Sequence, residues 1–193
     1  MSSGTRNHLT ARRVELFDGL VELLLAEGFA QLTLEQLATR LHCSKTTLYA
    51  LAGSKEQLVS AAVVHFFRGA TEQVEAALAS ANEPRRRIVV YLEAVAAQLQ
   101  QASPAFFDDL AGFPPARQVY QRNTQLAARR VQSLIADGVA SGDFREVHAA
   151  FVAEVIASVM VRIQQREVAR ATGLEDAQAY TELAALVMHG ITA

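Results

Sequence analysis

The sequence predicts an all-α fold of about nine helices. Half of its 193 residues are hydrophobic, and Gly and Pro are few, at 10 and 4 residues. Such a composition favours helix and can fill a core. Apolar residues recur at helical spacing through most of the chain, and no segment alternates polar and apolar residues as a strand does. Together these observations exclude a disordered chain and a β-sheet protein.

The first helix is predicted over residues 10–27, where apolar residues recur every three or four positions. Gly28 follows and fits the left-handed C-cap that ends many helices. The second helix is predicted to start after Thr33. Thr33 and Gln36 form a capping box, in which each side chain accepts a hydrogen bond from a free backbone N–H at the helix start.

A third, short helix is predicted over residues 45–51, with Ser44 as its N-cap. The polar segment 42–44 separates it from the second helix. Two short helices joined by a tight turn form a helix-turn-helix. The first three helices are therefore predicted to form a small module of this kind.

The remaining helices make up the larger part of the chain. Ser54 can cap a long helix that begins at Lys55, and prolines at 84, 104 and 114 suit the first turns of three more. The predicted spans after the one from Lys55 are 84–101, 105–110, 114–141, 147–170 and 175–189.

Several classes of protein are excluded by composition. The single cysteine, Cys43, excludes an intrachain disulfide, and no metal-binding pattern is present. The N-terminal segment is polar, unlike a signal peptide, and no run of about 18 uncharged apolar residues could cross a bilayer. We therefore expect a cytoplasmic protein with no cofactor, no metal ion and no membrane segment.

Charge gives no global indication of a nucleic-acid partner. The formal net charge is -2, and residues 1–56 carry six basic and six acidic residues. Any DNA-binding face must therefore come from where individual charges point.

The third helix has the residues that a helix in the major groove needs. Such a helix has a buried face that fixes its angle and an exposed face that reaches bases or phosphates. Leu48, with Leu51 or Ala52, supplies the buried face. The exposed residues are Lys45, Thr46, Thr47 and Tyr49.

Helix starts in the same region can hold a phosphate. Thr33 and Ser54 lie where free backbone N–H groups and the helix dipole favour an anion. Lys55 stands in the first turn of its helix, where the dipole disfavours a cation unless an anion is present. We therefore expect Lys55 to lie beside a bound phosphate.

Four short motifs occur in a characteristic order: Glu27-Gly28-Phe29, then Leu32-Thr33-Leu34 with Leu37-Ala38, then Ser44-Lys45-Thr46-Thr47-Leu48-Tyr49, then Lys55-Glu56 followed by Leu58. With this order and spacing, residues 10–60 resemble the N-terminal module of the tetracycline-repressor-type (TetR) transcriptional regulators. The resemblance implies a dimer with a helix-turn-helix DNA-binding domain, here residues 1–56. It also implies a C-terminal helical ligand-binding and dimerisation domain, here residues 57–193. The residues that it implies contact DNA are Thr33, Ser44, Lys45, Thr46, Thr47, Tyr49 and Lys55.

Three positions depart from the family pattern. His42 stands where the turn usually has glycine, so we expect it to adopt a left-handed conformation, which costs about 1–2 kcal/mol. Leu51 replaces a residue that commonly faces DNA. Ala52 replaces an aromatic anchor at the end of the recognition helix, and these two substitutions bear on how that helix is seated.

The C-terminal helices are unusually apolar. Residues 149–163 are apolar on nearly every face, so that helix is expected to be buried on both sides. The resemblance implies that the last two helices form a two-fold homodimer interface. A core helix of a monomer is the alternative.

Aromatic residues between the module and these helices are candidates for a ligand pocket, although a residue of this kind is more often part of a plain core than of a ligand site. Arg162 joins them because a charge in an apolar helix needs a partner, either an acidic ligand or a carboxylate such as Glu154 or Asp109. The candidate ligand-binding residues are His65, Phe66, Tyr91, Phe107, Phe113, Tyr120 and Arg162.

The leading functional hypothesis is a DNA-binding transcriptional regulator, a dimeric repressor released from double-stranded operator DNA by a small-molecule effector. The alternative is a helical small-molecule-binding protein or enzyme without DNA-binding activity. A dimeric DNA-architectural protein without a ligand is a third hypothesis. No nucleophile elbow, pair of catalytic carboxylates, metal cluster or glycine-rich phosphate loop is present, so we expect no enzymatic activity.

Overall fold

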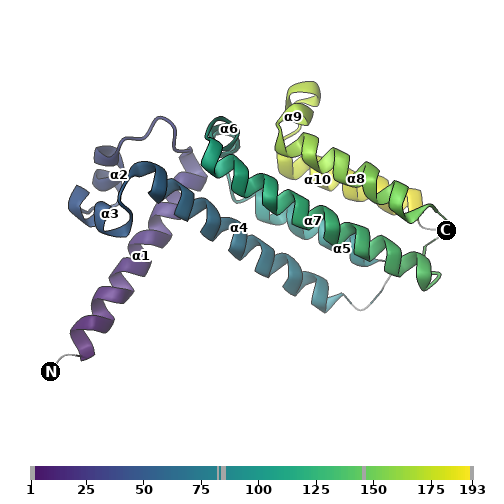
Figure 1. Ribbon diagram of the computed structural model, residues 1–193, viewed down its shortest axis with the longest axis horizontal. Helices are drawn as coiled ribbons and strands as arrows, with labels where there is room; N and C mark the ends of the chain where they lie inside the picture. Colours follow the sequence, from purple (N-terminus) through teal and green to yellow (C-terminus); the bar gives the residue numbers. More distant parts are fainter. Residues whose placement is uncertain (1–2, 82, 84–85, 145–146, 192–193) are drawn as a thin grey trace.

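The computed structural model describes residues 3–81, 83, 86–144 and 147–191. Within these ranges the protein is all-α, as the sequence predicts, with ten helices and no strand (Figure 1). None of these helices is both long enough and apolar enough to cross a membrane. The helices are α1 (Ser3–Glu27), α2 (Leu34–Arg40), α3 (Lys45–Leu51), α4 (Lys55–Ser80), α5 (Arg87–Leu99), α6 (Pro104–Gly112), α7 (Pro114–Ala140), α8 (Ala149–Gln164), α9 (Glu167–Thr172) and α10 (Asp176–Ile191).

The helices form a small N-terminal module and a layered body. Helices α2 and α3 lie beside α1 at one end of the molecule, and α4 runs from there along the body (Figure 1). In the body, α4 packs on α5 and α7, while α8 packs on α7 and α10 packs on α5. The short helix α6 lies where the module meets the body and contacts both α1 and α7.

Local signals in the sequence set most of the helix starts. Thr33 forms the predicted capping box with Gln36, and Ser44 and Ser54 accept hydrogen bonds from the backbone at the starts of α3 and α4. Gly28 and His42 have φ angles of 78° and 49°. Both predicted left-handed positions are therefore confirmed.

Two predicted helix boundaries differ from the structure. Helix α1 begins at Ser3 rather than at residue 10. The first turns of α1 project beyond the module (Figure 1). Residues 3–8 contain no apolar stripe from which a helix could be predicted. The expected helix start at Pro84 lies outside the described residues, and α5 is described from Arg87.

The helix predicted over residues 147–170 is divided into α8 and α9. The division falls at Arg166, whose φ angle of 59° is left-handed. Its side chain is 8% exposed, and the guanidinium bonds three carboxylates, Asp108 at 3.0 Å, Glu175 at 2.9 Å, and Asp176. The left-handed backbone costs about 1–2 kcal/mol. Charge-assisted hydrogen bonds of about 1.5–3 kcal/mol each offset that cost.

Helix α6 is fastened to the end of α1 by hydrogen bonds. The Asp109 carboxylate accepts from the backbone N–H groups of Phe29 at 2.5 Å and Ala30 at 2.7 Å. The N–H of Ser103, the N-cap of α6, donates to the carbonyl of Leu25 at 2.8 Å. Because Gly28 has no side chain, α6 can approach this closely. A Cβ there would lie 2.5 Å from the Asp109 carboxylate and 3.2 Å from the Ala105 backbone.

Gly28→Ala is expected to lower the free energy of unfolding by about 2 kcal/mol, because alanine is strained at this φ and its methyl group would displace Asp109. The measurement is urea unfolding followed by circular dichroism. Gly69→Ala is the matched control, since Gly69 lies inside α4 with no other atom within 4 Å of an added Cβ. That change should raise the free energy by roughly 0.5–1 kcal/mol. Equal effects from the two substitutions would contradict the assignment.

Candidate functional site

Helix α3 presents the side chains that the sequence predicts would face DNA. Leu48 is fully buried in the module, whereas Tyr49 is 50% exposed. Lys45, Thr46 and Thr47 are exposed with it. The structure therefore gathers these four residues on the outer side of one short helix.

The serine and threonine hydroxyls near α3 have local partners that fix their positions. Ser44 Oγ accepts from the Thr47 N–H at 3.1 Å and lies 2.8 Å from Thr47 Oγ1. Thr33 Oγ1 accepts from the Gln36 N–H at 3.2 Å. These bonds hold the starts of α2 and α3 in place.

The two lysines of the chain have different partners. Lys45 forms an exposed ion pair with Glu35 of α2, and this hydrogen bond, together with the lysine charge, lowers the pKa of Glu35. The Lys55 ammonium donates to the carbonyl of Ala30 at 3.1 Å. Lys55 therefore connects the start of α4 to the loop after α1, a role that the sequence did not predict.

The C-terminal end of α3 is held by an arginine from α1. Arg13 Nη2 donates to the Ala50 carbonyl at 2.9 Å, where the helix dipole favours a cation. Leu51 and Ala52, two of the three departures from the family pattern, are half-buried and pack against the core. Arg13 and Leu51 therefore hold α3 in place without an aromatic residue at position 52.

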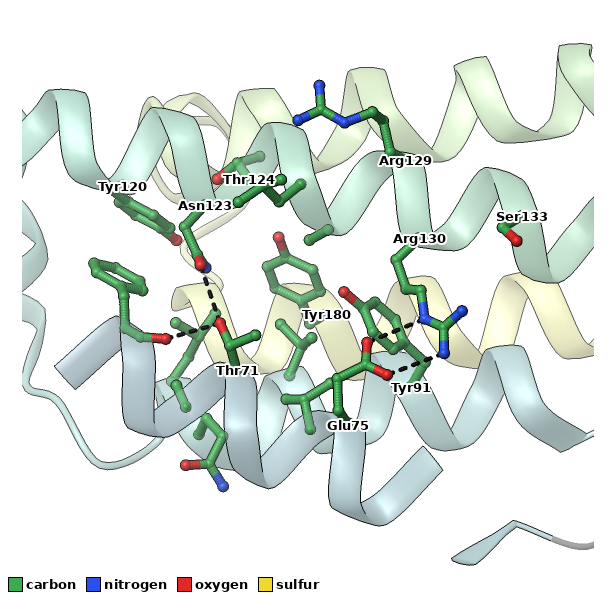
Figure 2. A pocket seen from close by; sticks show the side chains of 18 residues that line it. Thr71, Glu75, Tyr91, Tyr120, Asn123, Thr124, Arg129, Arg130, Ser133 and Tyr180 are labelled. Carbon is green, nitrogen blue, oxygen red and sulfur yellow. Dashed lines mark hydrogen bonds and ion pairs between the residues drawn. The ribbon is translucent and has the colours of Figure 1, made fainter. Parts of the chain in front are cut away.

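The body contains a cavity of about 370 Å³, of a size that suits a small ligand. It lies between α4, α5 and α7, with one residue from α10 (Figure 2). Its lining residues are Phe67, Ala70, Thr71, Val74, Glu75, Tyr91, Val95, Gln98, Leu99, Tyr120, Asn123, Thr124, Leu126, Ala127, Arg129, Arg130, Ser133 and Tyr180.

Two polar pairs cross the cavity wall from α4 to α7. Arg130 donates from Nε and Nη2 to the two carboxylate oxygens of Glu75, each at 3.0 Å. Thr71 donates to the Phe67 carbonyl at 2.8 Å and lies 3.2 Å from Asn123 Oδ1 (Figure 2). The Glu75–Arg130 pair is partly exposed, with side-chain exposures of 45% and 35%.

Tyr120 connects the cavity to the buried arginine cluster. Its ring stacks on Phe67, with centroids 4.9 Å apart. Its hydroxyl donates to Asp176 at 3.1 Å, and Asp176 in turn bonds Arg166. Burial, together with the nearby Asp176 charge, raises the pKa of Tyr120 well above its ordinary value, so the neutral phenol is the donor.

Of the seven candidate ligand-binding residues, Tyr91 and Tyr120 line this cavity. His65 is exposed beside Phe17, and Phe113 packs on Phe29. Phe66 and Phe107 each pack edge-on against Phe106. Arg162 is exposed, and its partner is Glu167 at 3.0 Å rather than Glu154 or Asp109.

Sequence reasoning did not identify Glu75, Arg130 and Tyr180 as cavity residues. Glu75 could have been suspected as a cavity residue because it is a charged residue on the inner face of α4. Its partner, however, lies 55 positions away in the chain. Nothing local distinguishes Tyr180 from a core tyrosine. The cavity is a consequence of how four helices pack.

The outer faces of α8 and α10 expose large apolar side chains. Phe151 and Val155 on α8 are 67% and 45% exposed, and Leu186 on α10 is 71% exposed. Large apolar surface of this kind marks interaction sites in soluble proteins.

Residues 16–62 match the family model for bacterial regulatory proteins of the tetR family. The search of curated protein sequences gave no match. Among solved structures, the chain is similar to the TetR family transcriptional regulator PfmR from Thermus thermophilus, with 22% identity and a TM-score of 0.65, covering 91% of this chain and 97% of that one.

Two further structures have higher TM-scores at lower sequence identity. One is a TetR transcription regulator from Haloarcula marismortui, with 15% identity and a TM-score of 0.73, covering 95% of this chain and 100% of that one. The other is a transcriptional regulator from Saccharomonospora viridis in complex with choline, with 16% identity and a TM-score of 0.73, covering 95% of this chain and 99% of that one. Residues 16–62 therefore match the N-terminal domain of the tetR family of bacterial regulatory proteins, and the chain shares the fold of these regulators over nearly its whole length.

Proposed function

We propose that this DNA-binding regulator is a dimeric repressor that a small-molecule effector releases from its operator. The observation that carries the proposal is the outer side of α3, where Lys45, Thr46, Thr47 and Tyr49 are exposed together on a helix seated by Leu48. These side chains can bond phosphates or base edges. Enzymatic activity forms no part of the proposed function.

The proposed DNA contacts are those that the sequence predicts: Thr33, Ser44, Lys45, Thr46, Thr47, Tyr49 and Lys55. Lys55 keeps its place among them although it bonds Ala30. An ammonium has three N–H donors, and the Ala30 carbonyl takes one of them. Two donors remain for a phosphate at the start of α4.

The proposed division of labour places DNA binding in residues 1–56 and effector binding with dimerisation in residues 57–193. The apolar faces of α8 and α10 support a two-fold interface through these helices, since such surfaces are normally covered. A dimer would place two α3 helices in successive major grooves of a pseudo-palindrome, about 34 Å apart.

The cavity is the proposed effector site. Its wall residue Tyr120 reaches Asp176 and Arg166, which bonds Asp108 on α6. The neighbouring Asp109 holds the backbone after α1. An effector that binds more tightly when these contacts shift would favour a module geometry that no longer fits the operator. The choline complex of the Saccharomonospora viridis regulator supports a small molecule in this fold.

Selection of genomic DNA fragments by the purified protein tests the proposal directly. Palindromic sites whose half-sites lie one helical turn apart are expected. Recovery of no preferred sequence would contradict a role as a specific repressor.

Lys45→Ala and Lys55→Ala are each expected to weaken operator binding and to make the slope of log affinity against log salt shallower by about one. Lys45→Ala should leave the melting temperature nearly unchanged, since an exposed ion pair contributes little to stability. The control is Arg68→Ala on α4, where Arg68 pairs with Glu72 one turn further along. Fluorescence anisotropy over a range of salt concentrations measures the slopes, and an unchanged slope for either lysine would remove that residue from the interface.

The double variant Phe151→Glu with Leu186→Glu is expected to be monomeric at micromolar concentration. Each subunit would then bring two negative charges into the proposed interface, where they would repel those of the other subunit. Light scattering measures the mass. Val64→Glu is the matched control, since Val64 is 50% exposed on α4, a helix outside the proposed interface. A double variant that remains a dimer would exclude α8 and α10 as the interface.

A further inference from the structure

We propose that the cavity selects an uncharged, largely apolar effector with a hydrogen-bond-accepting oxygen, which the hydroxyls of Tyr91 and Tyr180 bind. This inference rests on the proposed function only in treating the cavity as the effector site. It is carried by the charges of the cavity lining and by the tyrosine hydroxyls.

The partly exposed Glu75–Arg130 pair gives the cavity wall no net charge to offer a ligand. Glu75 and Arg130 neutralise each other through two hydrogen bonds of 3.0 Å. Arg129, the remaining charged lining residue, is exposed, and its guanidinium lies away from the cavity tyrosines in Figure 2. A charged ligand would therefore have to compete for one member of the Glu75–Arg130 pair or remain without a counter-ion.

Either choice disfavours an ion. A ligand carboxylate that drew Arg130 away would leave two carboxylates close together, which raises the free energy of both. A ligand ammonium that drew Glu75 away would leave Arg130 without its partner. Attraction of a cation to the faces of Phe67 and Tyr120 does not offset its removal from water.

An uncharged ligand oxygen, in contrast, can accept hydrogen bonds from hydroxyls that already line the cavity. Tyr91 and Tyr180 are 5% and 2% exposed and line the cavity. Neither hydroxyl is hydrogen-bonded to any protein group in the described part of the chain, and the hydroxyl of the lining residue Thr124 also lacks a partner there. Buried polar groups are normally hydrogen-bonded. Burial raises the pKa of both tyrosines, so both remain neutral donors.

The test uses three probes with the same phenylbutyl body, ending in a methyl ketone, a carboxylate or a trimethylammonium group. Isothermal titration calorimetry with the full-length protein and no DNA measures each dissociation constant. The ketone is expected to bind at least tenfold more tightly than either ion. Tyr91→Phe and Tyr180→Phe should each weaken ketone binding about fivefold. The control is Thr181→Val, which removes a hydroxyl from the neighbouring residue of α10 that does not line the cavity.

Two further variants test whether the neutral Glu75–Arg130 pair determines the charge of the ligand that the cavity selects. Glu75→Gln leaves Arg130 unpaired and should improve carboxylate binding at least tenfold. Arg130→Met leaves Glu75 unpaired and should improve trimethylammonium binding to the same extent. The proposal is overturned if an ion binds the unmodified protein as tightly as the ketone does, if neither tyrosine variant affects ketone binding, or if no probe binds at millimolar concentration.

A separate titration distinguishes failure of this inference from failure of the proposed function. Saturating ketone is added to the protein bound to a selected operator fragment, and release is followed by anisotropy. Selective ketone binding without DNA release would support the ligand class and contradict the effector role. Release by an ionic probe alone would support the effector role and overturn the ligand class.

Discussion

The buried guanidinium of Arg166 is the interaction on which the arrangement of the body depends. A cation removed from water is costly unless it is paired and hydrogen-bonded, and here Asp108, Glu175 and Asp176 all bond it. These partners come from α6 and from the segment that begins α10. Their attraction raises the pKa of Arg166 despite the opposing effect of its burial, so the charge is permanent. The same contacts fix the left-handed backbone that ends α8 and determine how α6, α8 and α10 meet.

Helix α6 extends this constraint to the N-terminal module. Adjacent residues on a helix point about 100° apart, so Asp108 and Asp109 can serve different neighbours. Asp108 bonds Arg166, and Asp109 bonds the amides of Phe29 and Ala30. Gly28 makes room for this contact. A short helix thus joins the end of α1 to the C-terminal helices through two carboxylates.

How much the sequence could predict depends on how far apart in the chain the interacting residues lie. The capping box at Thr33, the N-cap at Ser44 and the left-handed His42 were predicted because their partners lie within a few residues. Two arginines show where prediction from the sequence fails. The sequence singled out Arg162 for its apolar surroundings, yet Arg162 is exposed and Arg166 is buried, with a partner, Asp108, that is 58 positions away. Likewise Tyr91 and Tyr120 were predicted as pocket residues but Tyr180 was not, because core and cavity tyrosines follow the same helical periodicity.

Helix α4 is a single rigid rod with one end in the module and its middle in the cavity wall. From Lys55 to Thr71 and Glu75 it rises about 24–30 Å, at 1.5 Å per residue. A rotation of only 5° about the cavity end would therefore carry its first turn roughly 2 Å sideways. In the proposed dimer the separation of the two α3 helices would change by up to about 4 Å. Hydrogen bonds to DNA tolerate about 0.5 Å in length, so in the proposed repressor the lever arm of α4 would turn a small local adjustment into complete loss of register.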